Sequence, residues 1–273
     1  MKIAVLGPKG TYCDVALDKY LEEKNITAAE KVFYPTIIKT ANAVDDEVIG
    51  ILPFENSLDG FVMEALDRII QNKLTITGQV KLSIDFAFVT NATDISKVKT
   101  IYCQFKAYGQ CLDFIQEKDF QVIKTDSNVQ SADLLDKASE SFGAIIPVHV
   151  LEKRSYKMVI PHIADSKKNE TRFFIVQKEE GIKELRGKLN SSLVVFSSID
   201  RPGLLYDILS KFHDFNINLN SILSRPSKVD LGKYNFYMEC TLKNDEVSKL
   251  NQLIRELKTE GFEIQNLGVY NAL

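Results

Sequence analysis

The stretch richest in chemistry is Asn169-Glu170-Thr171-Arg172-Phe173, which the apolar residues Phe174-Ile175-Val176 follow directly. A hydroxyl, a permanent cation and an aromatic ring therefore lie side by side at the entrance of an expected strand. They suit a small, anionic, ring-shaped ligand, since a guanidinium can bind a carboxylate through two hydrogen bonds. The alternative is an ordinary strand entrance, in which Arg172 makes an internal salt bridge and Phe173 packs in the core. Strand alternation puts Thr171 and Phe173 on one face and Arg172 on the other.

A loop with two glycines, Gly7-Pro8-Lys9-Gly10-Thr11, joins an expected strand, Lys2–Leu6, to an expected helix over residues 12–23. Glycine lets the backbone approach a ligand closely, and free N–H groups at a helix N-terminus attract anions. The loop matches neither the dinucleotide-binding nor the Walker pattern. It is either an anion-binding loop or a plain turn in which Thr11 caps the helix.

A second polar loop, Glu55-Asn56-Ser57, follows the expected strand 48–52. It offers an acceptor, an amide and a hydroxyl. These side chains either contact a ligand or cap the amphipathic helix expected over 61–71, and both roles can hold at once.

The composition is that of an ordinary soluble globular protein, with 273 residues, 45% of them hydrophobic and 26% charged. This length allows two cores. The formal charge of −3 argues against a nucleic-acid binder. No apolar run approaches the ~18 residues that span a bilayer, and the apolar stretch after Lys2 is too short for a secretory signal. We expect a cytoplasmic protein that binds neither nucleic acid nor membrane.

The cysteines and histidines show no ligand spacing, so no metal is expected. They are Cys13, Cys103, Cys111, Cys240, His149, His162 and His213.

Strands alternate with helices up to about residue 180, which predicts parallel sheets covered on both faces. Further strands are expected at 82–89, 99–103, 121–124, 143–146 and 172–176, with helices at 107–116 and 130–138. The segment up to about residue 180 divides naturally into two small lobes. The polar loops follow expected strands, so they can face one cleft.

The charged segment Lys178–Asn190, which contains Gly181 and Gly187, has the composition of a linker. The pattern after it predicts a ferredoxin-like α+β domain. Its strands are expected at 193–199, 217–224, 234–240 and 263–269, and its helices at 203–212 and 246–259.

With Ser224-Arg225-Pro226-Ser227-Lys228 near its end, the chain carries these motifs in an order and at separations that resemble prephenate dehydratase with a C-terminal ACT regulatory domain. The resemblance covers nearly the whole chain. It implies an α/β, two-lobed catalytic domain like type II periplasmic binding proteins over 1–180, and an ACT domain over 190–273. One lobe would comprise about 1–77 plus 160–180, and the other 78–159.

The resemblance implies conversion of prephenate to phenylpyruvate, water and carbon dioxide in phenylalanine biosynthesis, without metal or organic cofactor. Thr171 would be the catalytic residue. Its hydroxyl is a poor general acid at neutral pH, but it can donate a preorganised hydrogen bond to the departing oxygen. Glu55 would hold its loop in place. The expected substrate contacts are Thr11, Asn56, Ser57, Ser127, Asn128, Arg172 and Phe173.

The ACT domain would bind phenylalanine between paired domains, so the resemblance implies a homodimer or homotetramer. The expected effector contacts are Gly203, Leu204, Leu205, Asn218, Leu219, Asn220, Ser224, Arg225 and Pro226. No chorismate mutase segment precedes Met1, so a monofunctional enzyme is expected.

Several side chains depart from the family pattern. Cys13 replaces a serine, Gln104 a histidine and Asn128 a threonine, while Leu204 replaces a small residue and Leu223 a glutamate. Three alternatives stay open: an arogenate dehydratase, a prephenate decarboxylase that does not dehydrate, and a non-catalytic sensor of aromatic acids.

Overall fold

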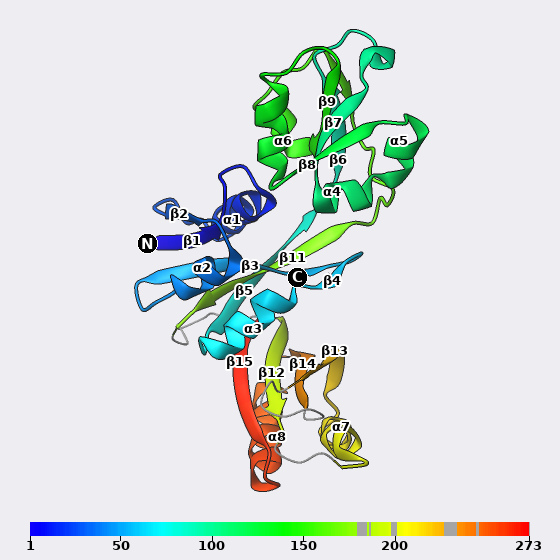
Figure 1. Cartoon of the computed structure of the whole chain (residues 1–273). Helices are drawn as coiled ribbons and strands as arrows, with labels where there is room; N and C mark the ends of the chain where they lie inside the picture. Colours follow the sequence, from blue (N-terminus) through cyan, green and yellow to red (C-terminus); the bar gives the residue numbers. More distant parts are fainter. Residues whose placement is uncertain (179–184, 186, 198–200, 227–233, 244–245, 273) are drawn as a thin grey trace.

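A computed structural model describes residues 1–178, 185, 187–197, 201–226, 234–243 and 246–272. The chain forms three sheets, each with its own helices (Figure 1). In the view of Figure 1 the second lobe lies at the top, the first lobe in the middle and the ACT-like domain at the bottom.

The first lobe is built on a sheet of order β2-β1-β3-β11-β5, in which β11 runs antiparallel to both neighbours. Its strands are β1 (Lys2–Leu6), β2 (Glu30–Tyr34), β3 (Val48–Asn56), β5 (Thr75–Ser83) and β11 (Glu170–Gln177), with β4 (Gly60–Phe61) paired to β3. Its helices are α1 (Tyr12–Glu23), α2 (Ile37–Asn42) and α3 (Met63–Gln71).

The second lobe has a sheet of order β10-β6-β9-β7-β8. Its strands are β6 (Phe86–Thr90), β7 (Thr100–Gln104), β8 (Gln121–Thr125), β9 (Phe142–Pro147) and β10 (Met158–Ile160). Its α-helices are α4 (Phe105–Gln110), α5 (Leu112–Glu117) and α6 (Asn128–Leu135), and its 3₁₀ helices are η1 (Ile95–Lys97) and η2 (Val148–Glu152).

The chain crosses between lobes later than the sequence suggested. The segment 82–89, expected as one strand, is divided between β5 in the first lobe and β6 in the second. At the break, Ile84 N–H donates to the carbonyl of Asn169, and Tyr12 Oη lies 2.6 Å from the carbonyl of Asp85. The chain therefore leaves the first lobe after Ser83 rather than near residue 78, and re-enters its sheet at Glu170 rather than near 160.

The third domain has the expected ferredoxin-like arrangement, an antiparallel sheet of order β13-β14-β12-β15. Its strands are β12 (Lys188–Phe196), β13 (Asn218–Pro226), β14 (Tyr234–Lys243) and β15 (Glu263–Asn271), and its helices are α7 (Leu204–Asp214) and α8 (Val247–Thr259). The helices cover one face through a core that includes Leu193, Ile208, Phe212, Leu250 and Leu253. The expected strand end at 198–199 and the loop positions 200, 227 and 228 lie outside the described residues.

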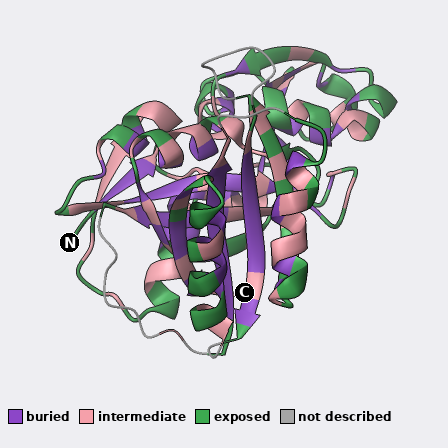
Figure 2. Cartoon of the chain, turned by 90° about the horizontal axis from the view of Figure 1, so that it is seen from below, coloured by how far each residue is buried: buried purple, intermediate pink, exposed green. Residues whose placement is uncertain are grey.

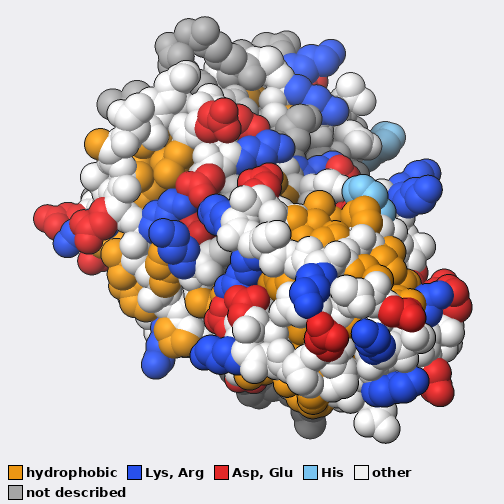
Figure 3. All heavy atoms as spheres, turned by 90° about the horizontal axis from the view of Figure 1, so that it is seen from above, with side chains coloured by type: hydrophobic (Ala, Val, Ile, Leu, Met, Phe, Trp, Pro, Cys, Tyr) orange, Lys and Arg blue, Asp and Glu red, His pale blue; other side chains and the backbone are white. Residues whose placement is uncertain are grey.

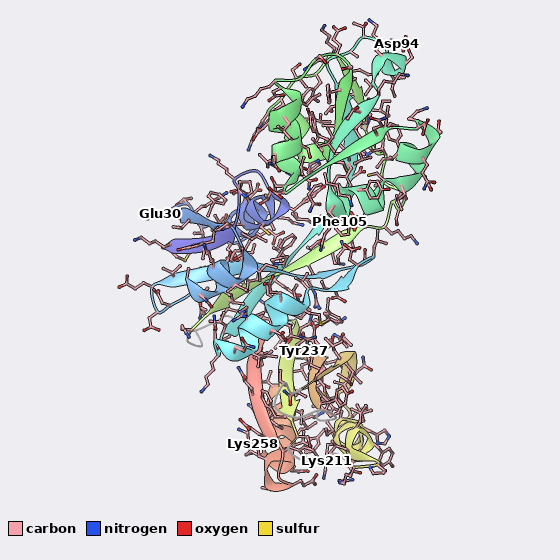
Figure 4. The ribbon with its side chains drawn as sticks, viewed as in Figure 1. Glu30, Asp94, Phe105, Lys211, Tyr237 and Lys258 are labelled. Atoms are coloured by element: carbon pink, nitrogen blue, oxygen red, sulfur yellow. The ribbon has the colours of Figure 1, made fainter. Side chains whose placement is uncertain are left out.

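The other face of this sheet packs against the first lobe. Phe54 stacks on Phe174 at 4.1 Å between ring centroids, and Tyr237 of β14 lies 5.6 Å from Phe54. Figure 4 shows Tyr237 at this junction, and Figure 2 shows the buried strands that run through the middle of the molecule. β15 approaches β5 closely at Gly268, where an added Cβ would lie 2.4 Å from the carbonyl oxygen of Ile76. The two domains therefore share one apolar cluster.

On the face seen from above in Figure 3, Lys and Arg side chains are mixed with Asp and Glu, and apolar side chains lie between them. Within the described residues, no helix is long and apolar enough to cross a membrane.

Candidate active site

A cavity of about 320 Å³ lies between the two lobes, with walls from both. First-lobe residues on it include Thr11, Cys13, Pro53, Asn56, Asp59, Thr171 and Phe173; second-lobe residues include Gln104, Lys106, Gln110, Asp126, Ser127 and Asn128. Its volume suits a small organic ligand. The segments around Thr11 and Ser127 meet here as expected, whereas Asn56 lies at the end of β3 and not in a loop, and its neighbours Glu55 and Ser57 are not on the wall.

Thr171 and Asn56 form a hydrogen-bonded pair in this cavity. The β11–β3 register places them opposite each other, and Asn56 Nδ2 donates to Thr171 Oγ1 at 2.9 Å. Because an amide N–H can only donate, this contact uses a lone pair of the hydroxyl. The Thr171 proton is then free to be donated to a ligand.

A chain of buried amides holds Asn56. Asn56 Nδ2 donates to Asn169 Oδ1 at 2.7 Å, Asn169 Nδ2 to Gln110 Oε1 at 2.9 Å, and Gln110 Nε2 to Asp59 Oδ2 at 3.3 Å. The exposed fractions of Asn56, Asn169 and Gln110 are 7%, 1% and 8%. The chain crosses from one lobe to the other, so it orients the pair and joins the cleft walls.

Gln110 and Asn169 were not among the predicted site residues. Asn169 opens the motif that contains Thr171, and Gln110 is the last residue of α4. Their contact joins residues 59 apart in sequence, which no local pattern could reveal.

The helix N-termini bring further polar groups to the cavity. Ser127 caps α6 by accepting a hydrogen bond from Gln130 N–H at 3.1 Å, as its position before a helix suggests. Asn128 is the first residue of that helix. Thr11 precedes α1, and its hydroxyl donates to the carbonyl of Leu6 instead of capping the helix.

Lys106 is the single Lys, Arg or His side chain on the cavity wall, as far as the structure is described. Its Nζ lies 3.8 Å from Asp59 Oδ2, and 58% of its side chain is exposed. The preceding residue, Phe105, lies where the second lobe faces the first (Figure 4). No sequence pattern pointed to Lys106, since one lysine in a helical turn is common.

Two expected substrate contacts lie elsewhere. Arg172 points away from the cavity and pairs with Glu55 and with Glu239 of β14, which is the internal salt bridge considered as its alternative role. Ser57 also lies off the cavity wall: its hydroxyl donates to the carbonyl of Lys168 and accepts from Glu170 N–H, both at 2.9 Å. Arg172 does not reach the cavity because it lies on the strand face opposite Thr171. The Ser57 hydroxyl is engaged in the hydrogen bonds that close its loop.

Phe173 combines both of its interpretations, because it is 1% exposed in the first-lobe core and also forms part of the cavity wall. Cys13 is buried, which raises its thiol pKa to about 12, so it is neutral at pH 7. Gln104 Oε1 accepts from Lys106 N–H at 2.7 Å and caps α4.

The expected effector residues are spread over two elements of the ACT-like domain. Gly203 precedes α7 with a φ of +83°, while Leu204 belongs to the core of the domain and Leu205 packs against that core. The remaining expected contacts lie on β13, the edge strand of the sheet. On it, Arg225 Nη2 contacts both oxygens of Asp67 at 2.7 Å, so this arginine binds the first lobe.

Among the described residues, no group of three or more His, Cys, Asp or Glu side chains could hold a metal ion.

Comparison with known proteins agrees with this arrangement. The family model for prephenate dehydratase matches residues 3–181, and that for the ACT domain matches residues 191–258. A prephenate dehydratase of Methanocaldococcus jannaschii is 32% identical over 96% of this chain and 95% of its own length.

Two solved structures share the fold over nearly the whole chain. The prephenate dehydratase of Staphylococcus aureus superposes with a TM-score of 0.83 at 31% identity, covering 99% of this chain and 100% of its own. That of Arthrobacter aurescens, solved in complex with L-Phe, has a TM-score of 0.84 at 24% identity and covers 100% and 90%.

The fold and the cleft define a two-lobed α/β protein with a regulatory ACT domain. The chain belongs to the prephenate dehydratase family.

Proposed function

We propose that this protein is a prephenate dehydratase, a lyase of phenylalanine biosynthesis that works in the cytoplasm. The observation that carries the proposal is the Thr171 hydroxyl, held by Asn56 in a closed network on the wall of the interlobe cavity. A sensor of aromatic acids would need only contacts to the acid groups. A hydroxyl whose proton is available can in addition donate a hydrogen bond to a leaving group.

In the reaction, the bond from the ring to its carboxylate breaks and releases carbon dioxide. The electron pair enters the ring, which becomes aromatic as the carbon–oxygen bond opposite breaks. The departing hydroxide takes up one proton from the solvent and becomes water. Thr171 stabilises the charge that develops on the departing oxygen, which is transition-state stabilisation by a preorganised donor. Asn56 and Asn169 hold that donor in place.

Incubation of the purified protein with prephenate at neutral pH tests the proposal. Phenylpyruvate should appear much faster than in a protein-free control. Arogenate in a parallel reaction decides the substrate, because both compounds carry the same ring hydroxyl and ring carboxylate. If neither prephenate nor arogenate gave a product, the protein would be a binding protein and not an enzyme.

Lys106 is the cation available to a carboxylate of the substrate, because Arg172 is engaged elsewhere. Lys106→Gln should raise KM for prephenate roughly tenfold, the scale of one charge-assisted hydrogen bond, with little change in kcat. Lys118→Gln is the matched control, since Lys118 is in the same lobe but pairs with Glu117. Steady-state kinetics on both variants decides the point, and an unchanged KM in Lys106→Gln removes this role.

Phenylalanine should bind and inhibit the full chain as a feedback effector. The positive φ of Gly203 allows close backbone approach at the start of α7, and β13 offers its edge to a second copy. We expect a homodimer or homotetramer with the effector between ACT domains. Calorimetry should detect phenylalanine at millimolar concentration and no heat for glycine, which lacks the ring. Absence of both heat and inhibition would overturn feedback by phenylalanine.

A further inference from the structure

One carboxylate of the ACT domain is buried beside β11, the strand that carries Thr171. Glu239 of β14 is 1% exposed and receives hydrogen bonds from Arg172 Nη1 at 2.6 Å and Nη2 at 2.8 Å. Asn190 Nδ2 donates to the same carboxylate at 3.1 Å, and the hydroxyls of Tyr237 and Tyr270 contact it at 3.4 and 3.2 Å. Its oxygens are therefore fully engaged, and Arg172 is its only cationic partner among the contacts described.

Arg172 links Glu239 to the residues beside the active site. Its Nη2 also donates to Glu55 Oε2 at 2.7 Å, and the β11–β3 register pairs Arg172 with Glu55 directly beside the pair Thr171 and Asn56. The register shifts between Arg172 and Phe173, so the strand pairing is irregular on the far side of this bridge. A bulge disrupts the ladder locally and redirects side chains. On this side of β11 the bridge from Arg172 to Glu55 adds a contact beside the disrupted pairing, while the pairing with β5 is regular from Glu170 to Ile175.

We propose that Glu239 is a positioning residue of the reaction, which acts through Arg172. By holding the guanidinium against Glu55, the ACT domain fixes the register that places Thr171 against Asn56. The active site is then complete only when the ACT sheet is seated on the first lobe.

The same contact lies next to the expected effector strand. On β13, Ser221 pairs with Glu239, and the preceding residue, Asn220, is the extra residue of a register shift. Asn220, Glu55 and Arg172 line a polar cavity of about 460 Å³ between the domains. β13 is therefore connected to β11, the strand that carries Thr171, through one intervening residue, Glu239.

The test compares two interdomain ion pairs in the full chain. Glu239→Gln should lower kcat about tenfold or more, as small misplacement of a catalytic group does, with KM for prephenate nearly unchanged. Asp67→Asn, which breaks the pair with Arg225 at the same interface, should leave kcat near wild type. Equal loss in both variants, or none in Glu239→Gln, overturns the proposal.

A double variant separates positioning from stability. Arg172→Met with Glu239→Leu removes both charges of the pair, so it should melt at a higher temperature than Glu239→Leu alone, while kcat stays low. Recovery of kcat together with Tm would show a purely structural role. This variant also keeps the test open if Glu239→Gln fails to fold.

The kinetic arm rests on the proposed function, so hydrogen exchange supplies a readout without turnover. In Glu239→Gln, amide exchange at residues 170–173 should be faster than in wild type, while β1 is unchanged. If the wild-type protein has no turnover but Glu239→Gln still shows this exchange pattern, the proposed function is refuted and the positioning contact is retained. Unchanged exchange at residues 170–173 overturns the positioning contact.

Discussion

Thr171→Ala is expected to lower kcat for prephenate by about 10²-fold or more, on the scale of losing one transition-state donor. Folding should be nearly unaffected, because Asn56 Nδ2 keeps the carbonyl of Glu170 and Asn169 Oδ1 as acceptors. Steady-state kinetics and thermal melting on one preparation provide the measurement.

Thr171→Ser is the matched control, because it restores a hydroxyl at the same position. It should retain most of the activity that Thr171→Ala loses. Near wild-type turnover in Thr171→Ala would remove this hydroxyl from the mechanism, whatever the melting temperature.

Arg172→Lys is expected to lower the melting temperature and kcat while KM for prephenate stays nearly unchanged. A lysine cannot reproduce the planar fork that contacts Glu55 and Glu239 together. Arg172→Met should be more severe, because removing one partner of a buried pair costs about 3–5 kcal/mol of unfolding free energy.

The alternative role of Arg172 predicts a different pattern. If its guanidinium bound a substrate carboxylate, Arg172→Lys would raise KM and leave the melting temperature in place. Melting curves and kinetics measured together therefore distinguish the structural pair from substrate binding.

The fold was largely predictable because the chain's patterns are local. The ferredoxin-like order of the last domain follows from alternating apolar strands and from helix faces such as that of Ile208 and Phe212. The crossover was misplaced because residues 82–89 have the alternation of one strand, with Leu82, Ile84, Phe86 and Phe88 on the same side, and periodicity cannot show that such a run serves two sheets. Residues 30–42, which form β2 and α2, were not expected as elements at all.

The site was predictable to the extent that strand alternation decides it. That rule put Thr171 and Phe173 on one face and Arg172 on the other, and the cavity wall confirms this division. The partner of Arg172 could not be predicted, because Glu239 is 67 residues away and belongs to another domain. The amide chain through Gln110 escaped prediction for the same reason.

Product stoichiometry with prephenate is the most direct test of the central claim. Carbon dioxide and phenylpyruvate, measured in one reaction of the purified protein at neutral pH, should form in equal amounts and saturably with substrate. Carbon dioxide released with a product that keeps its ring hydroxyl would contradict dehydration, and binding of prephenate without either product would contradict catalysis.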